Sequence, residues 1–290
     1  MITIQNSDIS LKVSPLGAQM MNICTSDGVE YLWQGDPAYW SSRSPILFPF
    51  VGRLTDNSYK YGGKTYPMTI HGFISAQEFR VAEQSDDSVT LEAESNDETL
   101  AKYPFSFLFR TQYKLCGNTI QITHTVVNRS DRMMPFGLGG HPGFRVPIVP
   151  EDRFENYYLE FDNPCEPDRI GFTPGVYLNG QDLPYPLTDG QRVPLVHSLF
   201  DNDALVFRNM DRGITLKSSS SSRGVHVDFP DFPYIGFWHK NCSDAPYVCI
   251  EPWTTLPSRQ DIVEDFSYKS DMIRLAPGAT YTNNWSIRIF

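Results

Sequence analysis

The feature that most constrains this chain is a period-two alternation of apolar and polar residues in many short runs. The runs are rich in β-branched and aromatic residues, and Gly, Asn, Asp and Pro separate them. This pattern is typical of strands that bury one face. It predicts strands over nine ranges, namely 2–4, 9–13, 88–93, 107–115, 119–127, 213–217, 224–228, 247–250 and 282–290.

The connections between these runs carry turn signals. Gly62-Gly63 lies between two aromatic runs, and Gly117-Asn118 lies between two long alternating segments. Both pairs tolerate positive φ, so each predicts a hairpin turn. The serine run 218–222 predicts a flexible hairpin loop. Helical signals are weak, and we expect single helical turns only at 99–103 and 258–264.

Strands of this number must each bury one face, and the chain lacks the helices that cover parallel sheets. Two packed antiparallel sheets satisfy this requirement. We therefore predict an all-β fold, a large antiparallel β-sandwich with few short helices. No segment reads as a domain linker, so residues 1–290 are expected to form one domain.

The charge balance argues against several classes of partner. With 24 Lys and Arg against 34 Asp and Glu, the net charge is −10, so the general attraction to nucleic acid or an anionic membrane is missing. No stretch approaches the roughly 20 apolar residues of a membrane span, and the N-terminus lacks a signal-peptide core. We expect a soluble, cytoplasmic protein, and a homodimer stays open.

The five cysteines are odd in number and include no C-x-x-C pair. This argues against a disulfide framework and against a cysteine zinc site. We expect reduced thiols, most of them buried.

Three short segments place one acid or base in a restricted loop: IHGF at His71, GGHPGF at His141 and CIEPW at Glu251. Glycine before and proline after His141 fix the backbone and let a ligand approach the imidazole. Glu251 follows an apolar run, where burial raises the pKa of a carboxyl towards the range of a general base. Loop-tying histidines and a solvated glutamate are the structural alternatives.

Further candidates surround these groups. Arg53 follows a hydrophobic run and offers a guanidinium suited to adjacent hydroxyls. Asp203 begins the DALVF run, and Asp201 is a competing placement for the same role. Aromatic rings such as Phe144 and Trp238 could cover the C–H faces of a sugar. Together these residues suggest a neutral polyhydroxylated ligand, although core packing is the alternative for each ring.

The segments FPFVGRL, IHGF, YPF, GGHPGF and CIEPW, in this order, resemble the aldose 1-epimerase (galactose mutarotase-like) superfamily, specifically its LacX-type branch. The resemblance spans nearly the whole chain. It implies a β-supersandwich and the interconversion of the α and β anomers of an aldose without a metal or organic cofactor. Typical galactose mutarotases carry an HPYF-like segment, whereas Pro-Gly-Phe follows His141 here, so the preferred sugar stays open.

The resemblance also implies roles for individual residues. His141 matches the family's catalytic acid, Glu251 its catalytic base and His71 its second active-site histidine. Arg53 matches the substrate-binding arginine, and the substrate-binding aspartate falls most plausibly at Asp203. In this scheme Glu251 takes the proton of the C1 hydroxyl while His141 protonates the ring oxygen, and the ring opens to a free aldehyde.

Three other functions compete with this one. A carbohydrate-binding or sensing protein would keep the pocket without turnover. A hexose-6-phosphate 1-epimerase would need several converging basic residues, for which Arg43, Arg53, Arg145 and Arg259 are candidates. A metal site built from the two histidines and Glu251 lacks the usual short ligand spacing, and no metal is expected.

Overall fold

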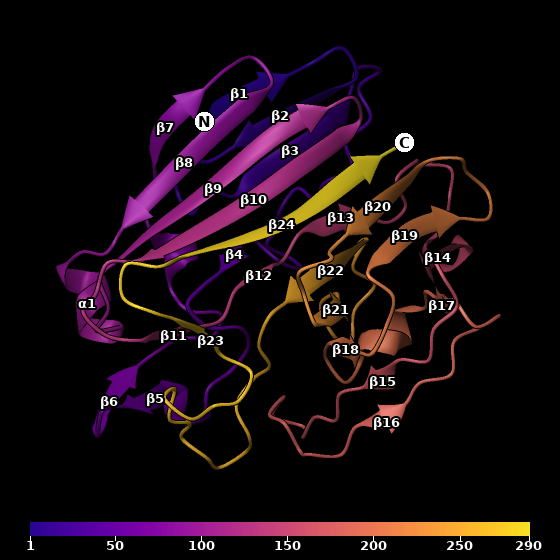
Figure 1. Cartoon of the computed structure of the whole chain (residues 1–290). Helices are drawn as coiled ribbons and strands as arrows, with labels where there is room; N and C mark the ends of the chain where they lie inside the picture. Colours follow the sequence, from indigo (N-terminus) through magenta and orange to yellow (C-terminus); the bar gives the residue numbers. More distant parts are fainter.

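The computed structural model describes all 290 residues and contains 24 β-strands, one α-helix and four short 3-10 helices. Most strands belong to two large antiparallel sheets (Figure 1). The first sheet has nine strands, in the order β17 (Arg192–Pro194), β14 (Tyr157–Phe161), β19 (Gly213–Ser218), β20 (Gly224–Asp228), β24 (Thr280–Ile289), β10 (Thr119–Asn128), β9 (Phe107–Cys116), β8 (Ser88–Glu94) and β7 (Arg80–Gln84).

The second sheet has eight strands. Its order is β16 (Leu183–Pro184), β15 (Asp168–Arg169), β18 (Leu205–Arg208), β21 (Tyr234–Trp238), β22 (Tyr247–Trp253), β12 (Gly139–Gly140) and β4 (Ile46–Leu47), with β13 (Gly143–Arg145) paired to β22.

Smaller elements complete the fold. The remaining strands are β1 (Ile2–Gln5), β2 (Ile9–Val13) and β3 (Met20–Thr25) in one sheet, and the pairs β5 (Ser58–Tyr61) with β6 (Lys64–Pro67) and β11 (Met134–Phe136) with β23 (Ile273–Leu275). The helices are α1 (Asp97–Lys102), η1 (Thr55–Asn57), η2 (Ile74–Ala76), η3 (Phe154–Asn156) and η4 (His197–Phe200). None of them is long and apolar enough to cross a bilayer.

The structure contains a strand at each of the nine predicted ranges. Both predicted hairpins are also confirmed. Gly62 (φ 56°) and Gly63 (φ 77°) connect β5 to β6, and Gly117 (φ 59°) begins the two-residue loop between β9 and β10. The serine run forms the loop from β19 to β20, and α1 covers the first predicted helical turn. The prediction of an all-β sandwich is confirmed, while a single domain stays a prediction.

Two expectations are wrong. Residues 258–264 form no helix, because the backbone of Arg259 pairs in an extended bridge with Leu178 and Asp261 adopts a left-handed conformation with φ 60°. A right-handed helix cannot include that residue without refolding it. The thiols are free, as expected, but only Cys249 is fully buried.

The main hydrophobic core contains 62 buried residues from both large sheets. Along β10 the side chains alternate between buried and partly exposed positions, which places Ile122 and Val126 in this core. The opposite sheet contributes Val248 and Ile250 from β22. Full burial of each such side chain stabilises the fold by about 1.5–3 kcal/mol.

Strand β22 differs from β10 because both of its faces are buried. Val248 and Ile250 face the main core, whereas Tyr247, Cys249 and Trp253 belong to two smaller clusters. Side chains alternate along a strand, so the second set lies on the opposite face of the sheet. That face, away from the main core, carries the candidate active site.

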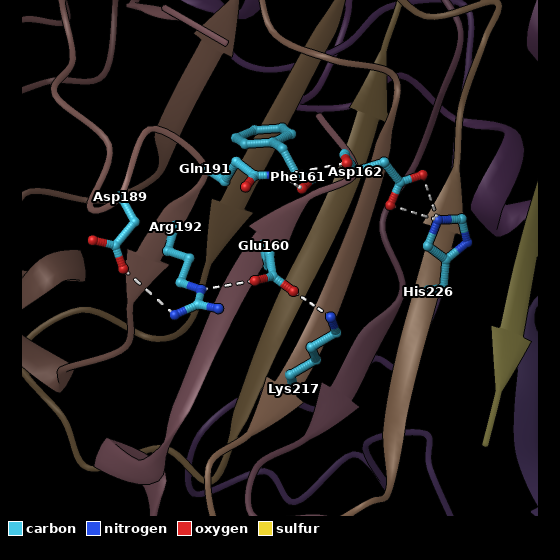
Figure 2. A network of polar contacts seen from close by, with 8 residues as sticks. All are labelled: Glu160, Phe161, Asp162, Asp189, Gln191, Arg192, Lys217 and His226. Atoms are coloured by element: carbon cyan, nitrogen blue, oxygen red, sulfur yellow. Dashed lines mark hydrogen bonds and ion pairs between the residues drawn. The ribbon is translucent and has the colours of Figure 1, made fainter. Parts of the chain in front are cut away.

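The outward face of β14 carries an ion-pair network (Figure 2). Glu160 accepts a 2.7 Å hydrogen bond from Arg192 Nε of β17 and pairs with Lys217 of β19. His226 of β20 lies 3.0 Å from a carboxylate oxygen of Asp162. Partly exposed pairs of this kind contribute about 0–1 kcal/mol each. These charges connect neighbouring strands and take no part in the pocket described next.

Candidate active site

A cavity of about 280 Å³ opens on the face of the eight-stranded sheet that lies away from the main core. It brings together six of the seven residues predicted for the site, although they come from six separate segments of the chain. They are Arg53, which follows β4, His71 before η2, His141 between β12 and β13, Asp203 before β18, Trp238 at the end of β21 and Glu251 within β22.

Glu251 lies in the middle of the most buried strand. Its side chain is 2% exposed, and its Oε2 atom has no hydrogen-bond partner. Burial, with a contribution from the negative charge of Asp203, raises the pKa of Glu251 well above its usual value. A carboxyl with these properties is suited to exchanging a proton with a ligand in the pocket.

The turn between β12 and β13 holds His141. A Cβ at Gly140 would lie 2.9 Å from the Trp285 ring, so only glycine lets this turn approach the core. The backbone N–H of His141 donates to the carbonyl of Pro45, and its imidazole stacks on Trp40 with ring centroids 4.8 Å apart. The Trp238 ring lies nearly perpendicular to the same imidazole, with ring centroids 5.7 Å apart. The imidazole is therefore held in one orientation.

His141 and Glu251 form a buried pair. His141 Nε2 lies 3.2 Å from Glu251 Oε2. Burial and the neighbouring His71 lower the pKa of His141, whereas burial raises the pKa of Glu251. Protonating His141 while Glu251 already carries a proton is therefore unfavourable, and so is removing the proton from Glu251 while His141 is neutral. The form with one proton is therefore favoured over an intermediate range of pH, and the pair titrates as a unit.

His71 occupies a strained part of the backbone. It has φ 63°, and Gly72 after it has φ 77°. Strain of this kind is common at functional sites. Its Nδ1 accepts a hydrogen bond of 3.1 Å from the backbone N–H of Gly52, which leaves the hydrogen on Nε2. Burial and nearby Arg53 lower its pKa to about 4. At neutral pH His71 therefore offers a ligand one N–H donor and no charge.

Arg53 and Asp203 lie at the rim of the pocket. The Arg53 side chain is exposed and forms no ion pair in the structure. Asp203 has φ 71°, and its Oδ1 accepts a hydrogen bond from the backbone N–H of Ala204. Asp201 is exposed and does not line the cavity. The geometry thus favours Asp203 as the pocket aspartate.

One predicted site residue is placed elsewhere. Phe144 is fully buried in the main core and does not line the pocket. It pairs with Val248, whereas the neighbouring Gly143 pairs with Cys249, so the pleat turns Phe144 towards the core. The prediction that Phe144 binds substrate is therefore wrong.

Other lining residues were not among the predicted site residues. Trp40 and Trp253 both line the pocket, and the buried indole N–H of Trp253 has no partner. Trp253 lies two positions after Glu251, so strand periodicity could have placed it on the same face. Phe172 and Val176 also line the pocket, from a loop that carries no sequence signal.

Comparisons with known proteins identify the family of the chain. A family model described as aldose 1-epimerase matches residues 1–288. Protein LacX of Lactococcus lactis subsp. lactis is 33% identical over 300 residues, which cover 99% of each chain. A galactose mutarotase related enzyme from Lactobacillus acidophilus is 32% identical, with a TM-score of 0.95 and coverage of 100% of this chain and 97% of its own. A galactose mutarotase-like protein from Lactobacillus casei, also 32% identical, superposes with a TM-score of 0.93 and full coverage of both chains.

Proposed function

Because the chain belongs to the aldose 1-epimerase family, in its LacX branch, and is an isomerase of the epimerase class, we propose that it interconverts the α and β anomers of a free hexose. The observation that carries the proposal is the buried pair of His141 and Glu251 in one pocket with room for a small ligand. The cavity of about 280 Å³ lies just below the range of about 300–1,000 Å³ that is typical of drug-sized ligands, so it suits a smaller ligand such as a monosaccharide.

The pair supplies both proton transfers of the reaction. In its ionic state, the Glu251 carboxylate takes the proton of the C1 hydroxyl and the His141 imidazolium donates a proton to the ring oxygen. The C1–O5 bond breaks and a free aldehyde forms. Rotation about C1–C2 and the reverse transfers close the ring as the other anomer. The C1 hydroxyl oxygen and the ring oxygen share one carbon, so an acid and a base in mutual contact can serve both.

The other lining residues position the sugar. The Nε2–H of His71 donates to a ring or hydroxyl oxygen, Arg53 donates to hydroxyls and Asp203 accepts from them. Trp40 and Trp238 offer aromatic faces to the C–H faces of the ring. These contacts keep the open aldehyde in the pocket while it rotates.

Polarimetry tests the proposal directly. Freshly dissolved α-D-glucose and α-D-galactose relax to their anomeric equilibria slowly in buffer, and the protein should accelerate at least one of these relaxations. Tight binding of a sugar without any acceleration would instead identify a carbohydrate-binding protein.

We expect the rate of mutarotation to change little over a wide pH range around neutrality. The active pair needs one proton. Burial lowers the pKa of His141, which moves the acid limb of the profile to lower pH, and raises that of Glu251, which moves the alkaline limb to higher pH. The measurement is kcat/KM by polarimetry between about pH 4 and about pH 10, a span that brackets the ordinary values of both groups. A narrow bell centred between those ordinary values would contradict the shared-proton pair.

Hexose 6-phosphates should be poor substrates, slower than the free hexose by at least about tenfold in kcat/KM, because the carboxylate of Asp203 lines the pocket and repels a phosphate dianion. Of the four arginines that could bind a phosphate, only Arg53 lines the cavity. Arg43 binds the carbonyl of Met21, and Arg259 pairs with Glu264. The same polarimetric assay with glucose and glucose 6-phosphate provides the comparison. A preference for the phosphate ester would instead support the phosphosugar epimerase.

A further inference from the structure

A third side chain joins the buried acid and base. The ligand-type atoms of His141, Cys249 and Glu251 all lie within 4.8 Å of one another, and all three residues are buried. Cys249 and Glu251 are two positions apart on β22, so they share one face of the strand. The pairing of Gly143 with Cys249 places Cys249 beside the turn that carries His141. The proton transfers described above do not use this thiol.

The spacing within this cluster resembles that of metal ligands. Zinc binds nitrogen and oxygen at about 2.0–2.1 Å in tetrahedral geometry, which separates two such ligands by about 3.3 Å. His141 Nε2 and Glu251 Oε2 are 3.2 Å apart, yet Oε2 has no hydrogen-bond partner. With a zinc–sulfur bond of about 2.3 Å, the thiolate needs to lie about 3.6 Å from the other two ligands. The three ligand atoms now lie within 4.8 Å of one another, so metal binding would draw the thiolate closer by up to about 1.2 Å.

We propose that His141, Cys249 and Glu251 bind one Zn²⁺ ion, or a similar thiophilic divalent cation, and that this metal inhibits the enzyme. A neutral imidazole, a thiolate and a carboxylate form a ligand set that zinc favours, and their two negative charges balance the dication in a buried site. Binding releases the thiol proton to water, together with the pair's proton. Mg²⁺ and Ca²⁺, which prefer oxygen ligands, bind poorly there.

The metal reaches the cluster through the sugar pocket, because His141 and Glu251 line it while Cys249 lies behind them. Three protein ligands leave the fourth zinc position open towards the cavity. Once coordinated, the imidazole and the carboxylate can no longer exchange protons with a sugar. The inhibition therefore rests on the proposed function, whereas metal binding itself does not.

Co²⁺ and Zn²⁺ are the probes that test the site. Co²⁺ added to the wild-type protein should give a near-ultraviolet thiolate charge-transfer band and tetrahedral d–d bands, at one ion per chain. Zn²⁺ should displace it, and calorimetry then gives the affinity. Cys249→Ala should lose the thiolate band and bind Zn²⁺ at least about 100-fold more weakly, since even supporting residues of metal sites contribute 10- to 100-fold.

The double variant Cys116→Ser/Cys242→Ser is the matched control, because it removes the two exposed thiols and keeps the buried one. It should retain the band and the affinity of the wild type. In the polarimetric assay, Zn²⁺ should inhibit the wild type and the control, a chelator should restore both, and Cys249→Ala should keep its basal activity and escape inhibition. Cys249→Ser serves where the alanine variant is unstable.

Absence of a thiolate band in the wild-type protein would overturn the proposal. So would equal zinc affinity in wild type and Cys249→Ala, because the metal would then bind elsewhere. If the band appears but no sugar is epimerised, the metal site stands and only the proposed function fails. If the wild type epimerises sugars and binds no zinc, the function stands and the metal site is refuted.

Discussion

Replacing Glu251 by glutamine is expected to slow mutarotation by about 10²- to 10⁴-fold, the usual contribution of one well-placed general base. Glutamine has nearly the same shape, so it keeps the packing of β22 but cannot accept the proton of the C1 hydroxyl. The loss should appear in kcat, because the residues that hold the ring hydroxyls are untouched. Polarimetry with saturating sugar measures it.

The free energy of unfolding of Glu251→Gln is the control that separates a loss of catalysis from a loss of folding. A carboxyl whose pKa is raised in the folded state binds more protons when folded than when unfolded, so its contribution to stability declines as pH rises above the unfolded pKa. Glutamine lacks this titration. The free energy of unfolding of Glu251→Gln in urea should therefore match or exceed that of the wild type at high pH. Full activity in a folded Glu251→Gln protein would remove Glu251 from the role of base.

Replacing His141 by asparagine should cost a similar factor, about 10²- to 10⁴-fold in rate, because the ring oxygen loses its proton donor. Asparagine keeps a polar side chain at the turn between β12 and β13 but cannot carry the proton that the pair shares. The variant should still bind sugar, because Trp40 and Trp238 still line the pocket. Quenching of the fluorescence of these two tryptophans measures the binding.

The double variant Glu251→Gln/His141→Asn sharpens this test. Groups that act as one unit show non-additive losses, so the double variant should be about as slow as the slower single variant. Two independent contributions would instead multiply. Multiplying losses would mean that the acid and the base do not work as the coupled pair inferred from their 3.2 Å contact.

The sequence predicted the long strands well because their signal is local. Alternation over ten residues, as in β9 and β10, is a strong pattern, and a glycine-containing turn between the two strands defines the hairpin. Strands β14 and β21 were not predicted. Strand β21 is buried or half-buried at every position, which removes clear alternation, and β14 (YYLEF) is aromatic or apolar at all but one of its positions. Sequence periodicity is weakest where both faces of a sheet are covered.

In the candidate site, too, the sequence predicted some features and only the fold determined others. Motif resemblance singled out His141 and Glu251 through their glycine, proline and aromatic neighbours. It could not distinguish Trp238, which lines the pocket, from Phe144, which packs in the core. That difference depends on the register between β13 and β22, which pairs residues about a hundred positions apart.

From the order of its residues alone, this protein is all-β and carries an imidazole and a carboxyl suited to acid and base chemistry, because alternation, turn propensity and motif identity are properties of neighbouring residues. Only the tertiary structure decided that these two groups lie 3.2 Å apart, that Cys249 stands beside them and that Arg43 and Arg259 stay out of the pocket. Those facts depend on which strands pair and in what register, and long-range packing of both sheets determines that pairing.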